Sequence, residues 1–322
     1  MLKKLELDAL KADLMTVESL LEARTEDEDP IGHYQFTARK IKLELQINNV
    51  TAHLDTHAQL GVFFGGGPVQ GSRGINADFA GKALEDLQAL ISKRFSEKET
   101  GPLKQRGPIR FNDRSQMLVT GVMRGSFGFV LEESGDTLEM LNTPLKDVVE
   151  EISDILSRIG ATDEAVFDEA AAELDERTLV TLKQFFQRLD EQEATLRIVQ
   201  GSRDFLLNRA AVSLARSRIQ EMKIVETGDD YTGQLFLLPE SRLFDLVSTI
   251  DGERIVLKGK VGPLVFKQLD GQQDLGEVAI DQTKLSQGLW RVEIKTREIQ
   301  ERNRAPRRVY SLSRLKGPIL TE

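Results

Sequence analysis

Apolar residues recur every three or four positions through the first part of the chain. The stripe covers two heptads, and its members are Leu7, Leu10, Leu14, Val17 and Leu21. Charged residues fill the positions between them, which is typical of a coiled-coil seam. An acidic stretch with Pro30 and Gly32 then interrupts the pattern. Residues 36–57 fit both the helical and the strand period, and their content of Lys, Glu, Gln, Leu and Ala favours a helix. We therefore predict an N-terminal helical hairpin.

The middle of the chain begins with a different pattern. Leu60–Phe64 is an apolar run that stops at Gly65–Gly67, as a buried strand followed by a turn would. Helical spacing then extends from Phe79 to Phe95, and one face of that helix must be buried. Two β segments between residues 116 and 131 predict a hairpin. A strand, a helix and a hairpin together predict a small α/β unit.

A helical segment follows this unit. Thr143 supplies a cap and Pro144 a first-turn proline, so a helix begins there. The patterned ranges are 144–160, 163–173 and 176–190 for helices and 195–200 for a strand. We expect Ser202 to cap a last helix that reaches about Met222, with Leu206 on its buried face.

Beyond residue 222 short β segments replace the helices. The strand-like ranges are 231–238, 243–250, 254–258, 289–296 and 308–312. Asp251 and Gly252 form a two-residue hairpin signal, and Gly262 with Pro263 begins a short helix or turn. Five short strands with one helical insert predict a small β-barrel of the SH3-like or OB-like kind.

The predicted fold class is therefore α+β with three domains. They are a helical hairpin arm (1–57), an α/β unit with a helical segment (58–222), and a small β-barrel domain (223–322).

Composition narrows the functions that this fold supports. The 322 residues include no cysteine and carry a formal net charge of −9. The missing cysteines exclude disulfides, thiolate nucleophiles and Cys-ligated zinc. No apolar run approaches the ~20 residues of a membrane helix, and acidic residues appear before any signal-peptide core. We expect a cytoplasmic protein that has no cofactor and no membrane partner.

A glycine-rich loop between the first predicted strand and the following helix is one candidate anion site. Its residues are Gly71, Ser72, Arg73 and Gly74. Backbone N–H groups of such a loop and of a helix N-terminus favour an anion. The loop lacks the Lys-Ser/Thr pair of a P-loop and the glycine spacing of a dinucleotide fingerprint, and a plain turn is the simpler interpretation.

Histidines offer no metal site that the pattern supports. His53 and His57 stand four residues apart, but Leu54 occupies the position where a hydrolytic zinc motif has glutamate. We therefore expect no metal ligands, and any acid–base chemistry would fall to carboxylates, Lys or Tyr.

The last two predicted strands and their connection carry a basic cluster with two aromatic residues. The candidate nucleic-acid-binding residues are Trp290, Lys295, Arg297, Arg302, Arg304, Arg307, Arg308 and Tyr310. Cations that follow phosphates and rings that stack on bases are typical of single-strand binders. A basic edge that prevents strand-to-strand aggregation explains the cluster equally, and the acidic whole protein opposes a polyanion.

Several motifs resemble those of uncharacterised bacterial proteins. They are Val62–Val69 with the sequence VFFGGGPV, Thr120–Glu133 with TGVMRGSFGFVLEE, and Thr232–Phe244 with TGQLFLLPESRLF. Some of these bacterial proteins are encoded near mobile elements and anti-phage defence genes. The resemblance implies a role in bacterial conflict and assigns no residue a function.

Three functional hypotheses follow. The first is a non-enzymatic binding or adaptor subunit that forms a homo-oligomer or holds a partner protein through its N-terminal helices. The second is nucleic-acid binding through the C-terminal barrel. The third is a carboxylate- or metal-dependent nuclease or hydrolase, for which Glu293 and Lys295 have the local spacing.

Overall fold

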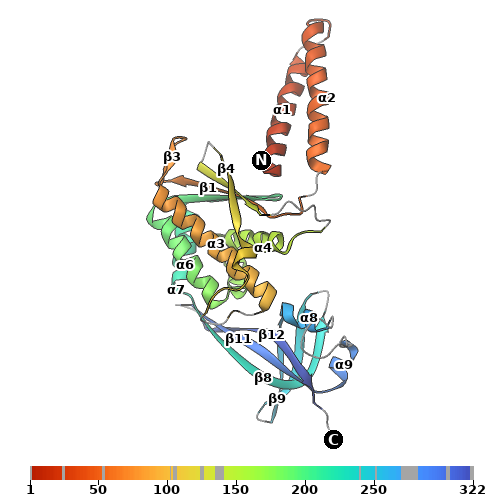
Figure 1. Cartoon of the computed structure of the whole chain (residues 1–322), viewed down its shortest axis with the longest axis vertical. Helices are drawn as coiled ribbons and strands as arrows, with labels where there is room; N and C mark the ends of the chain where they lie inside the picture. Colours follow the sequence, from red (N-terminus) through yellow and green to blue (C-terminus); the bar gives the residue numbers. More distant parts are fainter. Residues whose placement is uncertain are drawn as a thin grey trace. The chain divides into compact units, whose positions relative to one another are not determined.

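The computed structural model shows an α+β chain with N-terminal helices and a C-terminal closed barrel, which confirms the predicted fold class (Figure 1). It describes residues 2–23, 26–52, 55–101, 103, 107–123, 127–134, 141–238, 241–250, 252–269, 282–301 and 305–319. The chain forms two compact units. Unit 1 contains residues 1–80, 116–157 and 192–209, and unit 2 contains residues 81–115, 158–191 and 210–322.

The predicted helical hairpin is present in unit 1 as α1 (Lys3–Ala23) and α2 (Pro30–Ala52). Helix α2 begins six residues before the expected start. Asp29 explains this, because its Oδ1 accepts a hydrogen bond from the backbone N–H of Gly32 at 2.9 Å and so caps the helix. Pro30 fits the first helical position, where no N–H is needed.

The sheet of unit 1 has the order β4-β5-β1-β6-β7. Its strands are β1 (Gln59–Gly66), β4 (Met117–Met123), β5 (Phe127–Glu133), β6 (Ala194–Gln200) and β7 (Arg203–Leu207). The central strand β1 pairs antiparallel with both β5 and β6. Its apolar run is buried on both faces, which explains why it is continuous rather than alternating.

Strand β1 continues into the glycines that were expected to end it. Gly65 pairs with Thr195 and Gly66 with Ala194. Gly66 has φ +80°, and a Cβ there would collide with the backbone oxygen of Glu193. The glycines therefore permit two strands to approach closely, and the turn begins only after them.

One predicted helix is partly wrong. Residues 203–207 form strand β7, which pairs with β6, and helix α7 (Arg209–Glu221) begins only after it. The reason is local: Gly201 has φ +56°, so it makes a hairpin turn where Ser202 was expected to cap a helix. Leu206, expected inside the helix, is exposed on this edge strand.

Helix α4 (Pro144–Ile159) begins as predicted. The Thr143 hydroxyl accepts from the backbone N–H of Lys146 at 3.1 Å. That hydroxyl also donates to Glu133 at 2.6 Å, and the same carboxylate accepts from the backbone of Ala58 at 2.9 Å. Glu133 therefore joins the start of β1, the end of β5 and the start of α4.

The remaining elements before the barrel are short strands and helices. Strands β2 (Val69–Gln70) and β3 (Gly74–Ile75) form a small hairpin of unit 1. Helix α3 (Ala77–Thr100) starts in unit 1 and continues in unit 2. Unit 2 adds η1 (Asn112–Ser115), α5 (Glu164–Ala172), α6 (Glu176–Glu191) and most of α7. None of the described helices is long and apolar enough to cross a membrane.

The barrel of unit 2 is closed in the order β10-β12-β11-β8-β9. Its strands are β8 (Lys223–Leu238), β9 (Leu243–Ile250), β10 (Glu253–Val261), β11 (Trp290–Gln300) and β12 (Arg307–Pro318). Helices α8 (Pro263–Leu269) and α9 (Gln282–Gln287) lie between β10 and β11 in the chain. The barrel closes through a parallel pair, β10 with β12. This Greek-key order favours the OB-like of the two expected barrels.

A buried ion cluster joins the barrel to helix α3 within unit 2. The guanidinium of Arg297 lies 3.1 Å from Glu97 of α3 and 3.0 Å from Glu226 of β8, and Lys295 forms a further ion pair with Glu226. Arg297 Nε and Glu226 Oε1 are close enough for an ion pair, but neither of these two atoms makes a hydrogen bond. The four side chains of this cluster are only 7–12 % exposed, and Glu97 also contacts Arg94 at 2.8 Å.

A smaller ion cluster joins β10 to the end of α5. Glu173 accepts hydrogen bonds from Arg158 and lies 3.4 Å from the ammonium of Lys260. Burial by itself would raise the pKa of Glu173, but the Arg158 hydrogen bond and the two nearby cations outweigh it and lower that pKa.

We expect Arg297→Met to destabilise the protein by about 1–3 kcal/mol, because the carboxylates of Glu97 and Glu226 each lose one of their two cationic partners. Urea unfolding followed by circular dichroism measures the change. Arg291→Met is the matched control on the same strand, where the ion pair with Asp230 is exposed. Equal losses of stability in the two variants would contradict a stabilising role of the buried cluster.

Candidate functional site

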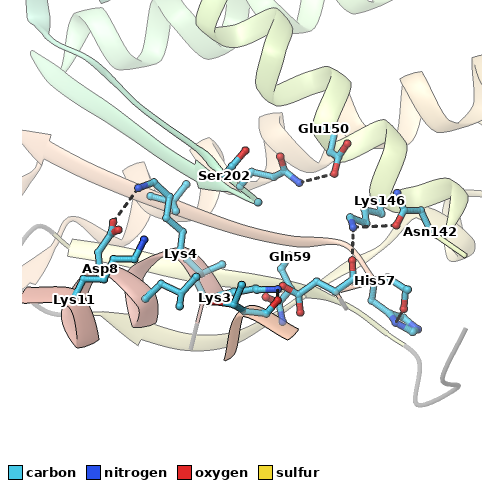
Figure 2. Close-up of a pocket in the computed structure, with 18 residues that line it drawn as sticks. Lys3, Lys4, Asp8, Lys11, His57, Gln59, Asn142, Lys146, Glu150 and Ser202 are labelled. Carbon is cyan, nitrogen blue, oxygen red and sulfur yellow. Dashed lines mark hydrogen bonds and ion pairs between the residues drawn. The ribbon is translucent and has the colours of Figure 1, made fainter. Parts of the chain in front are cut away.

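Residues from several elements of unit 1 form a pocket. Its cavity volume is about 550 Å³, within the range of small-molecule sites. Five parts of the chain line it: α1, the end of α2 with the following residues 55–57, the start of β1, the start of α4, and the end of β6 with its turn. Figure 2 shows these side chains around the opening.

Lysines dominate the polar lining of the pocket. Lys3, Lys4 and Lys11 come from α1, and Lys146 comes from the first turn of α4. Figure 2 shows Lys4 and Lys11 on one side of the pocket and Lys146 with His57 on the other. The carboxylates in the lining are Asp8, Asp55 and Glu150.

Neutral oxygens hold the ammonium of Lys146 in place. It donates to the backbone oxygen of Asp55 and, at 3.0 Å, to Oδ1 of Asn142. Within the described part of the chain, Lys146 has no carboxylate at ion-pair distance. The ammonium of Lys146 is therefore held in place by neutral groups, and no carboxylate among the described residues neutralises its charge.

The lining of the pocket also includes apolar and buried amide groups. Leu2 packs with Phe63, Val130 and Val199 in a small apolar cluster on the sheet. Gly61 makes room for this contact, because a Cβ there would collide with the Leu2 side chain. Gln200 is only 4 % exposed and donates to Glu150 at 3.3 Å.

The predicted glycine-rich anion loop forms the tip of the β2–β3 hairpin. Gly71 has φ +54°, and the backbone N–H of Arg73 donates to Gln70 at 3.0 Å, which closes a turn. Asn76 caps the following helix, because its Oδ1 accepts from the backbone N–H of Phe79 at 3.0 Å. Residues 71–74 therefore form a turn separate from the helix cap, and a side chain already fills that cap.

Of the two aromatic candidates in the C-terminal cluster, Trp290 lies in the barrel interior and Tyr310 is partly buried. Trp290 is 6 % exposed and lies in the main apolar core of the barrel, and Tyr310 packs against that core. Both were expected to stack on bases. The burial of Trp290 leaves its ring without an exposed face for stacking.

Most of the basic candidates that the structure describes are engaged in ion pairs. Lys295 and Arg297 belong to the buried ion cluster and are not available to phosphates. Arg307 contacts Glu301 at 2.8 Å and Asp168 at 3.4 Å, and exposed Arg308 contacts Glu298 at 3.2 Å. Arg302 and Arg304 lie outside the described residues.

A different face of the barrel carries exposed apolar and basic residues. Phe236 of β8 is 42 % exposed, and Leu243 of β9 and Val256 of β10 are exposed on the same side. Lys258 and Lys260 of β10 extend this face, with Lys258 paired to Asp245 at 3.0 Å. These exposed residues alternate with core residues along three separate strands, so the sequence pattern does not indicate that they share one face of the barrel.

The outer side of α2 carries a second apolar stripe. Ile31, Tyr34, Ile41 and Leu45 are each more than half exposed, and exposed Ala38 completes the heptad spacing. The residues Phe36, Leu43, Ile47 and Val50 form the other, less exposed stripe. The two stripes lie roughly 170° apart around the helix at ~100° per residue, on opposite faces.

Metal-ligand geometry adds no further site. In the described part of the chain, no three His, Asp or Glu residues gather closely enough to hold a metal ion. His57 lines the pocket, and His53 lies outside the described residues. Glu293 lies 3.6 Å from Lys316, while Lys295 pairs with Glu226.

Comparisons with models of protein families, with curated proteins and with solved structures all found nothing significant. The functional argument therefore rests on the residues themselves.

We expect Trp290→Ala to lower the free energy of unfolding by about 3–5 kcal/mol, because it empties the centre of the barrel core. The protein has one tryptophan, so the wild-type fluorescence reports directly on unfolding of the barrel. Leu289→Ala is the control for the variant, since the neighbouring Leu289 is exposed, and circular dichroism follows both variants. A Trp290→Ala protein as stable as wild type would show that the ring does not support the core.

Proposed function

We propose that this chain is a non-enzymatic binding subunit that self-associates through the outer stripe of α2. The observation that carries the proposal is the exposed second heptad stripe, because monomeric helices do not ordinarily expose an apolar seam of this length. A cytoplasmic location and a role in bacterial anti-phage defence belong to the same proposal, and the defence role rests only on the short motifs at 62–69, 120–133 and 232–244.

A second copy of the chain fits this stripe. In an antiparallel pair of α2 helices, one register brings Tyr34 against Leu45 of the second copy and Ala38 against Ile41. Each of these two layers then pairs a larger side chain with a smaller one, as interdigitating helices require. The flanking pairs in this register are Gln35 with Lys42 and Thr37 with Glu44, so no like charges meet.

The size of the stripe predicts the strength of association. Its 15 residues, 31–45, extend over only about 21 Å of helix at ~1.5 Å per residue. Such a short helix–helix contact falls below the ~800 Å² per partner of a standard stable interface. We therefore propose a concentration-dependent dimer rather than an obligate one.

We expect the wild-type mass in solution to rise from that of the 36.1 kDa monomer towards twice that value as concentration increases. Ile41→Glu should keep the protein monomeric, because a charge in the seam must be desolvated without a partner. Analytical ultracentrifugation across a concentration series measures both proteins.

Val180→Glu is the matched control, since Val180 is also a half-exposed apolar residue on a helix but belongs to α6. It should dimerise as the wild type does. A wild-type protein that stays monomeric up to several hundred micromolar, or equal loss of dimer in both variants, would overturn self-association.

The barrel face supports nucleic-acid binding as a second candidate function. Strands β9 and β10 are the second and third strands of the barrel, the ones that OB-type barrels use for oligonucleotides. Phe236 offers a partly exposed ring on the adjacent strand, and Lys258 and Lys260 are exposed cations that would have to exchange their ion pairs with Asp245 and Glu173 for phosphates. This proposal moves the interface away from the β11–β12 residues expected from the sequence.

We expect Phe236→Ala to weaken single-strand binding by roughly 1–3 kcal/mol, the contribution of one stacked base. Fluorescence anisotropy with labelled single-stranded DNA and RNA at low salt measures it. Phe111→Ala is the control, because Phe111 has the same 42 % exposure elsewhere in the chain. Absence of saturable binding by the wild-type protein would remove this candidate.

A further inference from the structure

The lysine-lined pocket of unit 1 contains four lysines and three carboxylates, so its lining carries a net positive charge. Lys4 pairs with Asp8 at 2.9 Å, and Gln200 donates to Glu150 at 3.3 Å. Among the described residues, neither Lys11 nor Lys146 has a carboxylate at ion-pair distance. A lining with this imbalance attracts an anion.

Lys146 is the best-positioned of these cations. An ammonium has three N–H donors, and two of them bind Asp55 and Asn142, so a third is available to a ligand. Its backbone N–H is fixed by the Thr143 hydroxyl. The charge is therefore held in place before any ligand arrives, which reduces the entropic cost of binding.

The rest of the lining suits an organic body rather than a bare ion. Leu2, Leu7 and Val199 supply apolar surface, and the buried Gln200 supplies an amide for a specific hydrogen bond. The volume of about 550 Å³ exceeds what inorganic phosphate needs and fits a molecule of nucleotide size.

We propose that this pocket binds a small organic phosphate of about nucleoside-monophosphate size. The phosphate contacts Lys146 and the lysines of α1, and the organic part lies against the apolar lining. A phosphate monoester carries roughly −1.5 to −2 charges at neutral pH, which matches more than one lysine.

A ligand in this pocket would contact two separate elements of unit 1. Lys3, Lys4 and Lys11 belong to α1, whereas Lys146 belongs to α4 on the sheet of the same unit. A phosphate that contacts both would add an interaction between the base of the helical hairpin and the sheet. Binding should therefore slow hydrogen exchange in α1 and in residues 55–59.

Isothermal titration calorimetry on the full-length protein tests the proposal with three probes: adenosine 5′-monophosphate, inorganic phosphate and adenosine. We expect the monophosphate to bind most tightly and to raise the melting temperature by linkage. Lys146→Met should weaken its binding about tenfold or more, since a hydrogen bond to a charged group is lost. Hydrogen exchange with and without the monophosphate supplies the second readout.

Two further variants separate ligand binding from folding. Lys11→Met removes a charge that makes no ion pair in the described structure, so it should weaken binding without altering the fold. Lys223→Met on β8 is the control, because Lys223 is exposed and lies outside the pocket lining. It should bind the monophosphate as the wild type does.

The proposal is overturned if neither phosphate probe binds at millimolar concentration, or if adenosine binds as tightly as its monophosphate. Inorganic phosphate that binds as tightly as the monophosphate would overturn the assignment of an organic ligand. Equal weakening in Lys146→Met and Lys223→Met would show that the pocket is not the site.

Discussion

The buried pairing of Arg297 with Glu97 and Glu226 is the constraint on which unit 2 depends. Charged groups can leave water only when their partners leave with them, so strand β11, strand β8 and helix α3 must assemble together. These residues are separated by as much as 200 positions in the chain. This ion cluster is one contact that joins residues 81–115 to the barrel within unit 2.

Unit 1 depends on close approach rather than on charge. Gly61 admits Leu2 against the sheet, and Gly66 admits the backbone of Glu193 beside β1. The first of these contacts seats the start of α1, which brings three lysines beside the first turn of α4. The pocket therefore results from packing at the base of the hairpin, and its charge comes from residues whose spacing resembles that of ordinary solvated helix positions.

Burial decides which of the chain's conspicuous residues remain available for binding. Trp290 fills the barrel core, whereas Phe236, a less conspicuous residue in the sequence, is exposed on the outer face. Lys295 and Arg297 neutralise buried carboxylates, whereas Lys258 and Lys260 stay at the surface. On α2, one apolar stripe is less exposed and the other lies open to solvent. Composition alone does not show which of these residues are buried and which are exposed.

The sequence by itself determined most of the elements, because helical and strand periods, the Thr143 cap and the Gly252 turn are local signals. It failed at residues 202–207, where a glycine turn and the edge of a sheet overrode a helical pattern. Only the tertiary structure decided the buried ion cluster, the lysine pocket and the exposed barrel face. Each of them joins residues from distant segments, and which face of a strand or helix becomes covered depends on what packs against it. That information is absent from the local pattern.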